Sequence, residues 1–210
     1  MMLLPLYIHP LVDPLGWESL GQCRGDRVTA IVNVHNGPGE DRDEVYAVAL
    51  ARLHKFGVRM LGYVDLDYGA RSNGEVWCDI VGWSRYPVGG VFFDRVPSDA
   101  PGLAYTSQVV RAVRGQVVLN PGTTCLPGYA ALADVVCTFE GSWSTYLGRP
   151  SERDWPNAAH LVYGVPETEI GAATALLLSR APHGLVTDLD WPLPYEGLPS
   201  SLRTRLMAYL

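Results

Sequence analysis

The sequence predicts an α/β fold, a compact single-domain (β/α)8 TIM-like barrel that covers residues 1–210. Eight apolar runs of strand length each end in polar residues, and helical patterns separate most of them. Continuous apolar runs are typical of parallel strands that helices bury on both faces. The mass of 23.0 kDa fits one small barrel, because about 200 residues is the lower limit for this architecture.

The predicted strands succeed one another along the whole chain. They span residues 3–8, 28–34, 58–64, 90–93, 116–119, 135–139, 160–162 and 185–187. The polar residues at or after their ends are His9, His35, Asn36, Asp65, Asp67, Asp94, Asn120, Glu140, Tyr163 and Asp188. All strand C-termini of such a barrel open onto one face, so these residues are expected to converge on one pocket. No composition shift or repeat marks a second domain.

Five of the connections predict helices. These span residues 39–57, 76–85, 104–114, 167–180 and 200–208. The first has an acidic start, His54 and Lys55 near its end, and Gly57 as a C-cap, an order that complements the helix dipole. Its packed face is predicted to comprise Val45, Val48, Ala49, Arg52, Leu53 and Phe56. The connections after the first, fifth and sixth strands are shorter and richer in Gly and Pro.

Composition limits the classes of partner. A formal net charge of -6 and a pI near 5.3, without a Lys/Arg block, argue against nucleic acid. Eleven Tyr and six Trp favour stacking on an uncharged ligand such as a polysaccharide or oligosaccharide. No apolar run reaches about 18 residues, so no membrane span is predicted. The N-terminus shows no signal peptide, so we expect a cytoplasmic monomer, or a secreted one if a leader has been removed.

The cysteines and histidines form no recognisable metal motif. Cys23, Cys78, Cys125 and Cys137 have neither CxxC nor metal-ligand spacing, and we expect most to be reduced and packed. His9, His35 and His160 are expected to be hydrogen-bonded structural residues. A GxSxG elbow is missing, which disfavours a hydrolase triad. We therefore predict no metal and no cofactor.

Two carboxylates directly follow very apolar strands. Asp94 ends the segment VFFD, and Glu140 ends TFE. A carboxylate at a pocket edge loses hydration, which raises its pKa and suits it to general acid catalysis. Two inward carboxylates are the minimum apparatus for glycoside hydrolysis. Each could instead cap a helix or pair with an arginine, but their position favours catalysis.

Further residues at the strand ends are predicted to bind substrate. They are Tyr7, Asn33, Asn36, Tyr63, Asp67, Tyr68, Arg71, Asn120, Trp143, Tyr163 and Asp188. Asp67 is expected to share the pocket side with Tyr63, and Asp65 is not. Two alternatives stay open, because Asp188 could cap the next turn and Arg71 could fix its own loop.

Six segments in order, IVNVHNGPG, LGYVDLDYGARS, VGGVFFD, VVLNPGT, ADVVCTFEGSW and LVTD, make the chain resemble the spherulin-4-like family, also called spherulation-specific family 4. The resemblance runs from Tyr7 to about Trp191. It implies a barrel of glycoside hydrolase type and endo-acting hydrolysis of α-1,4-linked galactosamine or N-acetylgalactosamine polymers such as galactosaminogalactan. The family's key acids are an Asp-Glu pair ending strand four and a Glu ending strand six. Asp94 and Glu140 match this pattern.

Arg95 departs from it, because the family often has Glu at this position. An inward arginine would lower the pKa of Asp94, whereas alternation along the strand would turn Arg95 toward the helix layer. Two hypotheses remain: an endo-acting glycosidase, or a catalytically inactive carbohydrate-binding barrel, which Arg95 suggests. Strand spacing favours a retaining pair with Asp94 as nucleophile and Glu140 as acid/base, unless the substrate's own N-acetyl group attacks.

Overall fold

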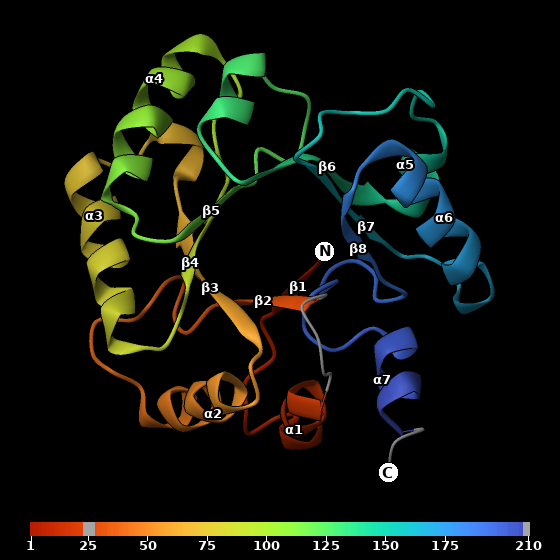
Figure 1. The fold of residues 1–210 in the computed structure, drawn as a ribbon, viewed down its shortest axis with the longest axis horizontal. Helices are drawn as coiled ribbons and strands as arrows, with labels where there is room; N and C mark the ends of the chain where they lie inside the picture. The colour runs from red at the N-terminus through yellow and green to blue at the C-terminus, as the bar shows by residue number, and fades with distance from the viewer. Residues whose placement is uncertain (23–27, 208–210) are drawn as a thin grey trace.

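Eight parallel strands close into a barrel in the computed structural model, which describes residues 1–22 and 28–207 (Figure 1). The strands are β1 (Met2–Leu6), β2 (Val28–Val32), β3 (Arg59–Asp65), β4 (Gly90–Asp94), β5 (Gln116–Leu119), β6 (Val135–Ser142), β7 (Ala158–Tyr163) and β8 (His183–Val186). Each strand pairs with the next one in the chain, and β8 pairs with β1. The predicted (β/α)8 fold is confirmed, and every predicted run overlaps a strand.

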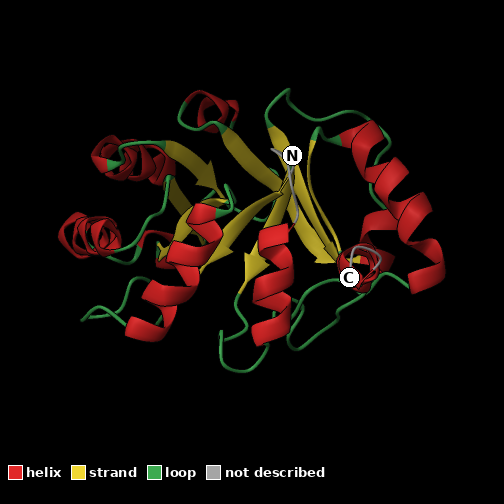
Figure 2. Cartoon of the chain, turned by 60° about the horizontal axis from the view of Figure 1, so that its bottom comes forward, coloured by secondary structure: helices red, strands yellow, loops and turns green. Residues whose placement is uncertain are grey.

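Helices surround the barrel on its outside (Figures 1 and 2). They are α1 (Pro14–Gln22), α2 (Glu44–Lys55), α3 (Asn73–Gly82), α4 (Ala100–Val109), α5 (Trp143–Leu147), α6 (Ile170–Arg180) and α7 (Ser200–Met207). Short 3-10 turns are η1 (Asp67–Gly69), η2 (Trp83–Arg85), η3 (Val110–Ala112), η4 (Pro127–Ala131) and η5 (Glu167–Glu169). The connections after β5 and β6 are short as expected, but α1 was not predicted, because it lacks an acidic first turn and a basic last turn.

Helix α2 begins later than its sequence pattern predicts. The Asp43 side chain accepts hydrogen bonds from the backbone N–H groups of Val45 and Tyr46, so it caps the helix and leaves residues 39–43 in the preceding loop. Gly57 ends it with φ +79°, as predicted. The predicted packed face is largely wrong. The buried residues are Tyr46, Ala47, Leu50 and Leu53, whereas Val48 and Phe56 are exposed.

A close contact between β3 and the end of α3 fixes the wall of the barrel. Trp83 is buried, and its indole N–H donates to the carbonyl oxygen of Tyr63 at 2.9 Å. A Cβ atom on Gly62 would lie 2.3 Å from the Trp83 ring, so this strand position requires glycine. The contact therefore holds the backbone beside Tyr63, whose side chain reaches the candidate site.

A buried polar network fixes β6 and β7 against α5. His160 is hydrogen-bonded to the Tyr146 hydroxyl at 2.7 Å and to Asp154 at 2.8 Å. Asp154 also accepts from the Thr138 hydroxyl at 2.6 Å and from Arg149 at 2.7 Å. Burial lowers the pKa of His160. The prediction that His160 is a hydrogen-bonded structural residue is confirmed, and its network supports the strand that carries Glu140.

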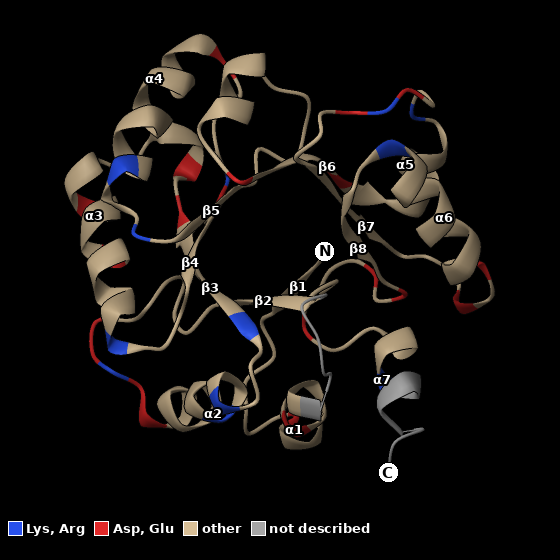
Figure 3. Ribbon diagram, in the orientation of Figure 1, with Lys and Arg blue, Asp and Glu red and all other residues tan. Residues whose placement is uncertain are grey.

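Lys and Arg are spread over several helices and loops, with acidic positions between them (Figure 3).

Cys125 and Cys137 are buried free thiols, Cys78 is an exposed one, and Cys23 lies outside the described residues. None of the helices in the described part of the chain is long and apolar enough to cross a membrane.

We predict that Gly62→Ala lowers the free energy of unfolding by about 1–3 kcal/mol, because the new methyl group overlaps the Trp83 ring. Gly171→Ala is the control, since Gly171 lies in α6 with open space around a new Cβ atom. It should raise the unfolding free energy by up to about 1 kcal/mol. Urea denaturation measures both, and equal effects of the two substitutions would contradict this packing.

Candidate active site

Two carboxylates meet at the C-terminal end of the barrel beside one asparagine. Asp94 ends β4, Glu140 lies in β6, and Asn120 directly follows β5 between them. The Nδ2 atom of Asn120 donates to Asp94 Oδ1 at 2.8 Å and to Glu140 Oε2 at 2.6 Å. An amide nitrogen carries two hydrogens, one for each carboxylate. The two oxygens therefore lie no more than about 5.4 Å apart, the sum of these distances.

Tyrosines supply the next donors. The Tyr63 hydroxyl donates to Asp94 Oδ2 at 2.9 Å, and the Tyr195 hydroxyl donates to Glu140 Oε1 at 2.8 Å. The ring of Tyr7 stands edge-on to both tyrosines, with centroid distances of 5.7 Å to Tyr63 and 6.0 Å to Tyr195. Three tyrosine side chains thus line the site around the two carboxylates, while Asp94 and Glu140 each remain partly exposed.

The environment makes ionisation of both carboxyl groups harder. Loss of hydration is the largest cause that raises the pKa of Asp94, and hydrogen bonds from Tyr63, Asn120 and the backbone N–H of Arg95 act against it. Burial also raises the pKa of Glu140, and the neighbouring charge of Asp94 adds to this rise. Two carboxyl groups with different donor sets can hold one proton and one charge between them, which is what an acid and a nucleophile require.

Asp65 forms a second charged cluster beside the pair. It ends β3, is 2% exposed, and lies opposite Asp94 in the strand register. Arg95 donates to it through Nε at 2.8 Å and through a short contact from Nη2, and the backbone N–H of Asp67 donates at 2.8 Å. Arg95 also pairs with Asp67 at 2.9 Å. Burial alone would raise the pKa of Asp65, but these donors lower it overall.

The cluster corrects two expectations. Residues two apart on a strand share a face, so Asp65 lies on the same side as Tyr63, and the expectation that it does not was wrong. Arg95 does not face the helix layer, because it leaves β4 with φ +48° and its guanidinium turns toward the end of β3. Asp67 belongs to the same cluster and is half exposed.

Three other predicted residues lie in the loops around this cluster. The Asn33 side chain accepts from the backbone N–H of Gly37 at 2.9 Å and so closes its own turn. The exposed Asn36 places its amide 3.5 Å from Asp65. Tyr68 is exposed beneath the Arg95 guanidinium, 5.7 Å from the ring centre.

Arg71 fixes its loop, as the alternative interpretation held. Its guanidinium donates to the carbonyl oxygen of Asp65 at 2.8 Å and pairs with Asp79 at 2.7 Å.

Three other predicted residues make no hydrogen bond to the carboxylate pair in the described part of the chain. Trp143 is buried in a core cluster, and its indole N–H donates to Glu169 at 2.9 Å, so its predicted role as a stacking face is not supported. Asp188 does not cap the next turn but accepts from the backbone N–H of Ser200, the first residue of α7, at 2.8 Å. Tyr163 ends β7 and is half-buried.

Sequence reasoning missed Tyr195. It lies in the Pro-rich loop between β8 and α7, where no strand or helix period predicts the direction of a side chain. The backbone N–H of Tyr7 donates to the carbonyl oxygen of Tyr195 at 3.2 Å, which holds this loop against the residue that follows β1. An aromatic residue in the loop after the last strand was the available signal.

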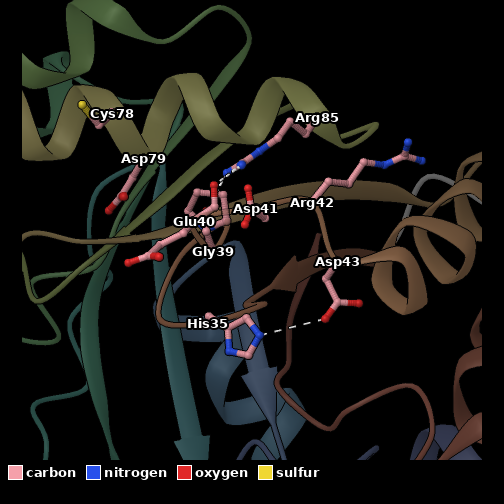
Figure 4. A pocket seen from close by; sticks show the side chains of 10 residues that line it. His35, Gly39, Glu40, Asp41, Arg42, Asp43, Cys78, Asp79 and Arg85 are labelled. Carbon is pink, nitrogen blue, oxygen red and sulfur yellow. Dashed lines mark hydrogen bonds and ion pairs between the residues drawn. The ribbon is translucent and has the colours of Figure 1, made fainter.

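A hollow of about 810 Å³ lies between the β2–α2 loop and α3 (Figure 4). It is lined by His35, Pro38, Gly39, Glu40, Asp41, Arg42, Asp43, Cys78, Asp79 and Arg85. Figure 4 shows the His35 ring directed toward Asp43, at 4.0 Å. The lining does not include Asp94 or Glu140, so the hollow is separate from the carboxylate pair.

Known proteins resemble the chain in both sequence and structure. A model of spherulation-specific family 4 matches residues 1–208. Spherulin-4 from Physarum polycephalum is 34% identical over an alignment of 153 positions that covers 68% of this chain and 45% of that relative, so the chain matches less than half of its length. The crystal structure of Aspergillus clavatus Sph3 in complex with GalNAc is similar, with a TM-score of 0.82 and 28% identity, over 99% of this chain and 96% of that one.

We predict that Asp94→Asn and Glu140→Gln each stabilise the protein at pH 7, by about 0.5–2 kcal/mol. A raised pKa means that the folded state holds the proton more tightly than the unfolded state. Each carboxyl group therefore costs no stability at a pH below its pKa in the unfolded chain. The free energy of unfolding falls as the pH rises toward and through the pKa of the same group in the folded protein. The neutral amides avoid this loss, and the tyrosine hydroxyls can turn to accept from them.

Thermal unfolding between pH 4 and pH 7 measures the effect. The gain should disappear toward pH 4. Asp188→Asn is the control, because the asparagine side-chain oxygen can still accept from the backbone N–H of Ser200, and it should give no pH-dependent gain. A gain that is the same at pH 4 and pH 7 would contradict the proposed cause.

Proposed function

The chain belongs to spherulation-specific family 4, and on that premise we propose that it is a glycoside hydrolase in which Asp94 and Glu140 are the catalytic carboxylates. One observation carries the proposal: the Asn120 amide donates to both carboxylates, which fixes them as a pair. Both groups are partly exposed at the strand ends, where barrels of this kind have their active sites.

The spacing of the pair supports a retaining mechanism. Retaining glycosidases have carboxyl groups about 5–5.5 Å apart, whereas inverting ones keep about 6.5–9.5 Å to admit a water molecule. The oxygens that share Asn120 lie within about 5.4 Å of each other, from distances of 2.8 and 2.6 Å. This spacing is shorter than the separation that inverting enzymes keep for their water.

The hydrogen bonds support different roles for the two groups. Asp94 accepts from Tyr63, Asn120 and the backbone N–H of Arg95, and three donors favour its ionised form as nucleophile. Glu140 accepts from Asn120 and Tyr195, so it is the better holder of the shared proton. In this assignment Asp94 attacks the anomeric carbon while Glu140 protonates the leaving oxygen. Glu140 then removes a proton from the water that releases the sugar.

The proposed substrate is an α-1,4-linked galactosamine or N-acetylgalactosamine polysaccharide, cleaved within the chain. Support comes from family membership and from the bound GalNAc in the similar Sph3 structure. Aromatic side chains around the pair suit the apolar faces of sugar rings. Tyr7, Tyr63 and Tyr195 wall the pair, and the exposed Tyr68 and Trp191 lie in the loops after β3 and β8.

A carbohydrate-binding barrel without catalysis is the alternative that Arg95 suggests. The guanidinium of Arg95 is engaged by Asp65 and Asp67, however, and Asp94 accepts from Tyr63, from Asn120 and from the backbone N–H of Arg95. The charge at position 95 thus leaves the carboxylate pair intact, which favours the enzyme.

We predict that Asp94→Asn and Glu140→Gln each lower kcat on a partly deacetylated galactosamine polymer by about 10²–10⁴-fold, because nucleophilic attack or proton transfer is lost. Binding of galactosamine oligomers should persist in calorimetry, since the side-chain shapes are kept. Reducing-end release measures turnover, with Asp188→Asn as the control that keeps the parent rate. Parent rates in either active-site variant would refute the assignment.

A second prediction concerns stereochemistry. The pair should release the α-anomer first from an α-linked polymer, because two displacements restore the configuration. Proton NMR during the first minutes of hydrolysis distinguishes the anomers before they equilibrate. Initial release of the β-anomer would exclude retention, whether Asp94 or the substrate's N-acetyl group attacks.

A further inference from the structure

We propose that Arg95 is a positioning residue for the proposed hydrolysis: by pairing with Asp65 it cancels a negative charge beside Asp94 and keeps Asp94 available as nucleophile. The inference rests on the proposed function. It gives a positioning role to Arg95, the residue that suggested a barrel without catalysis.

The strand register places the charge. Asp65 and Asp94 are direct partners on β3 and β4, and neighbouring strands lie about 4.8 Å apart. Asp65 is 2% exposed, so water screens its charge poorly. Arg95 binds both oxygens of Asp65, one through Nε at 2.8 Å and the other through Nη2. This bidentate pairing places the positive charge next to the buried aspartate.

Backbone strain marks the same cluster. The four non-glycine residues with positive φ in the described part of the chain are Asn36, Asp67, Tyr68 and Arg95, at 47°, 45°, 54° and 48°. The side-chain amide of Asn36 and the backbone N–H of Asp67 donate to Asp65, and the backbone N–H of Tyr68 donates to the carbonyl oxygen of Arg95 at 2.7 Å. Strained residues persist where surrounding contacts over-determine them, and they gather at functional sites. Here all four serve the Asp65–Arg95 pair.

The other groups around Asp94 leave Asp65 as the charge to be cancelled. The titratable or charged groups that face Asp94 are Tyr7 directly after β1, Tyr63 and Asp65 from β3, Arg95, Cys137 and Glu140 from β6, and Tyr195 from the loop after β8. The pKa of each of the three phenols and of the thiol is raised, so these groups stay neutral. Glu140 holds the proton in the proposed roles. Asp65 is then the remaining anion of this set, and its charge raises the pKa of Asp94.

Three variants of the full chain test the inference by the pH dependence of kcat/KM. Arg95→Gln leaves the negative charge of Asp65 uncompensated beside Asp94. The acidic limb of the pH profile, where kcat/KM falls because Asp94 becomes protonated, should therefore move to higher pH. At a pH on this limb, kcat/KM should fall roughly fivefold or more relative to its plateau. Asp65→Asn removes the negative charge that pairs with the Arg95 guanidinium, so the positive charge of Arg95 should move the acidic limb to lower pH. Arg95→Lys keeps the charge and should stay near the parent. A structural role alone would not move the limb in opposite directions.

The double variant Arg95→Gln with Asp65→Asn should return the limb toward the parent. Carbon-13 NMR titration of the Asp94 carboxyl in the same proteins gives a readout that does not depend on activity. If the parent cleaves no polysaccharide, the proposed function fails, while opposite NMR shifts in the two single variants would still support the charge pairing. Should Arg95→Gln not fold, Asp65→Asn and Arg95→Lys decide by the same readouts. Shifts in the same direction, or no shift, would overturn the inference.

Discussion

The amide of Asn120 donates one hydrogen bond to Asp94 and one to Glu140, and the arrangement of the candidate site depends on this bridge. Barrel closure makes the bridge possible, because β4, β5 and β6 are consecutive neighbours. Backbone bonds hold the three strand ends level: Asn120 N–H donates to Phe93 at 2.8 Å, and Glu140 N–H donates to Gly122 at 2.9 Å. Gly122 has φ +67°, which permits the sharp turn beside Glu140.

This arrangement lowers stability in favour of a preorganised site. The side-chain oxygen of Asn120 is buried and has no hydrogen-bond partner among the described residues, because both amide hydrogens face the carboxylates. Buried polar atoms are rarely left unpaired, and exceptions call for a functional reason. Burial likewise raises the pKa of both Asp94 and Glu140, which makes them harder to ionise in the fold. Natural proteins accept such losses where activity requires them.

The buried strands could be predicted from the sequence, whereas the directions of side chains that lie in or next to loops could not. The apolar runs located all eight strands, and the position directly after an apolar run identified Asp94 and Glu140. Tyr195 was missed because it lies in a loop, where no strand or helix period predicts the direction of a side chain. Trp143 was misplaced because it begins α5 and turns into the core instead of the pocket. The Asp65–Arg95 pair was missed because a left-handed residue after β4 ends the strand alternation.

The central claim is that Asp94 is the nucleophile of a retaining pair bridged by Asn120. Mass spectrometry of the protein after reaction with a 5-fluoro α-glycosyl fluoride of the amino sugar tests this claim most directly, because such a substrate slows release of a covalent intermediate. We expect a sugar adduct on the peptide that contains Asp94. An adduct on any other residue, or steady hydrolysis without an adduct, would contradict the claim.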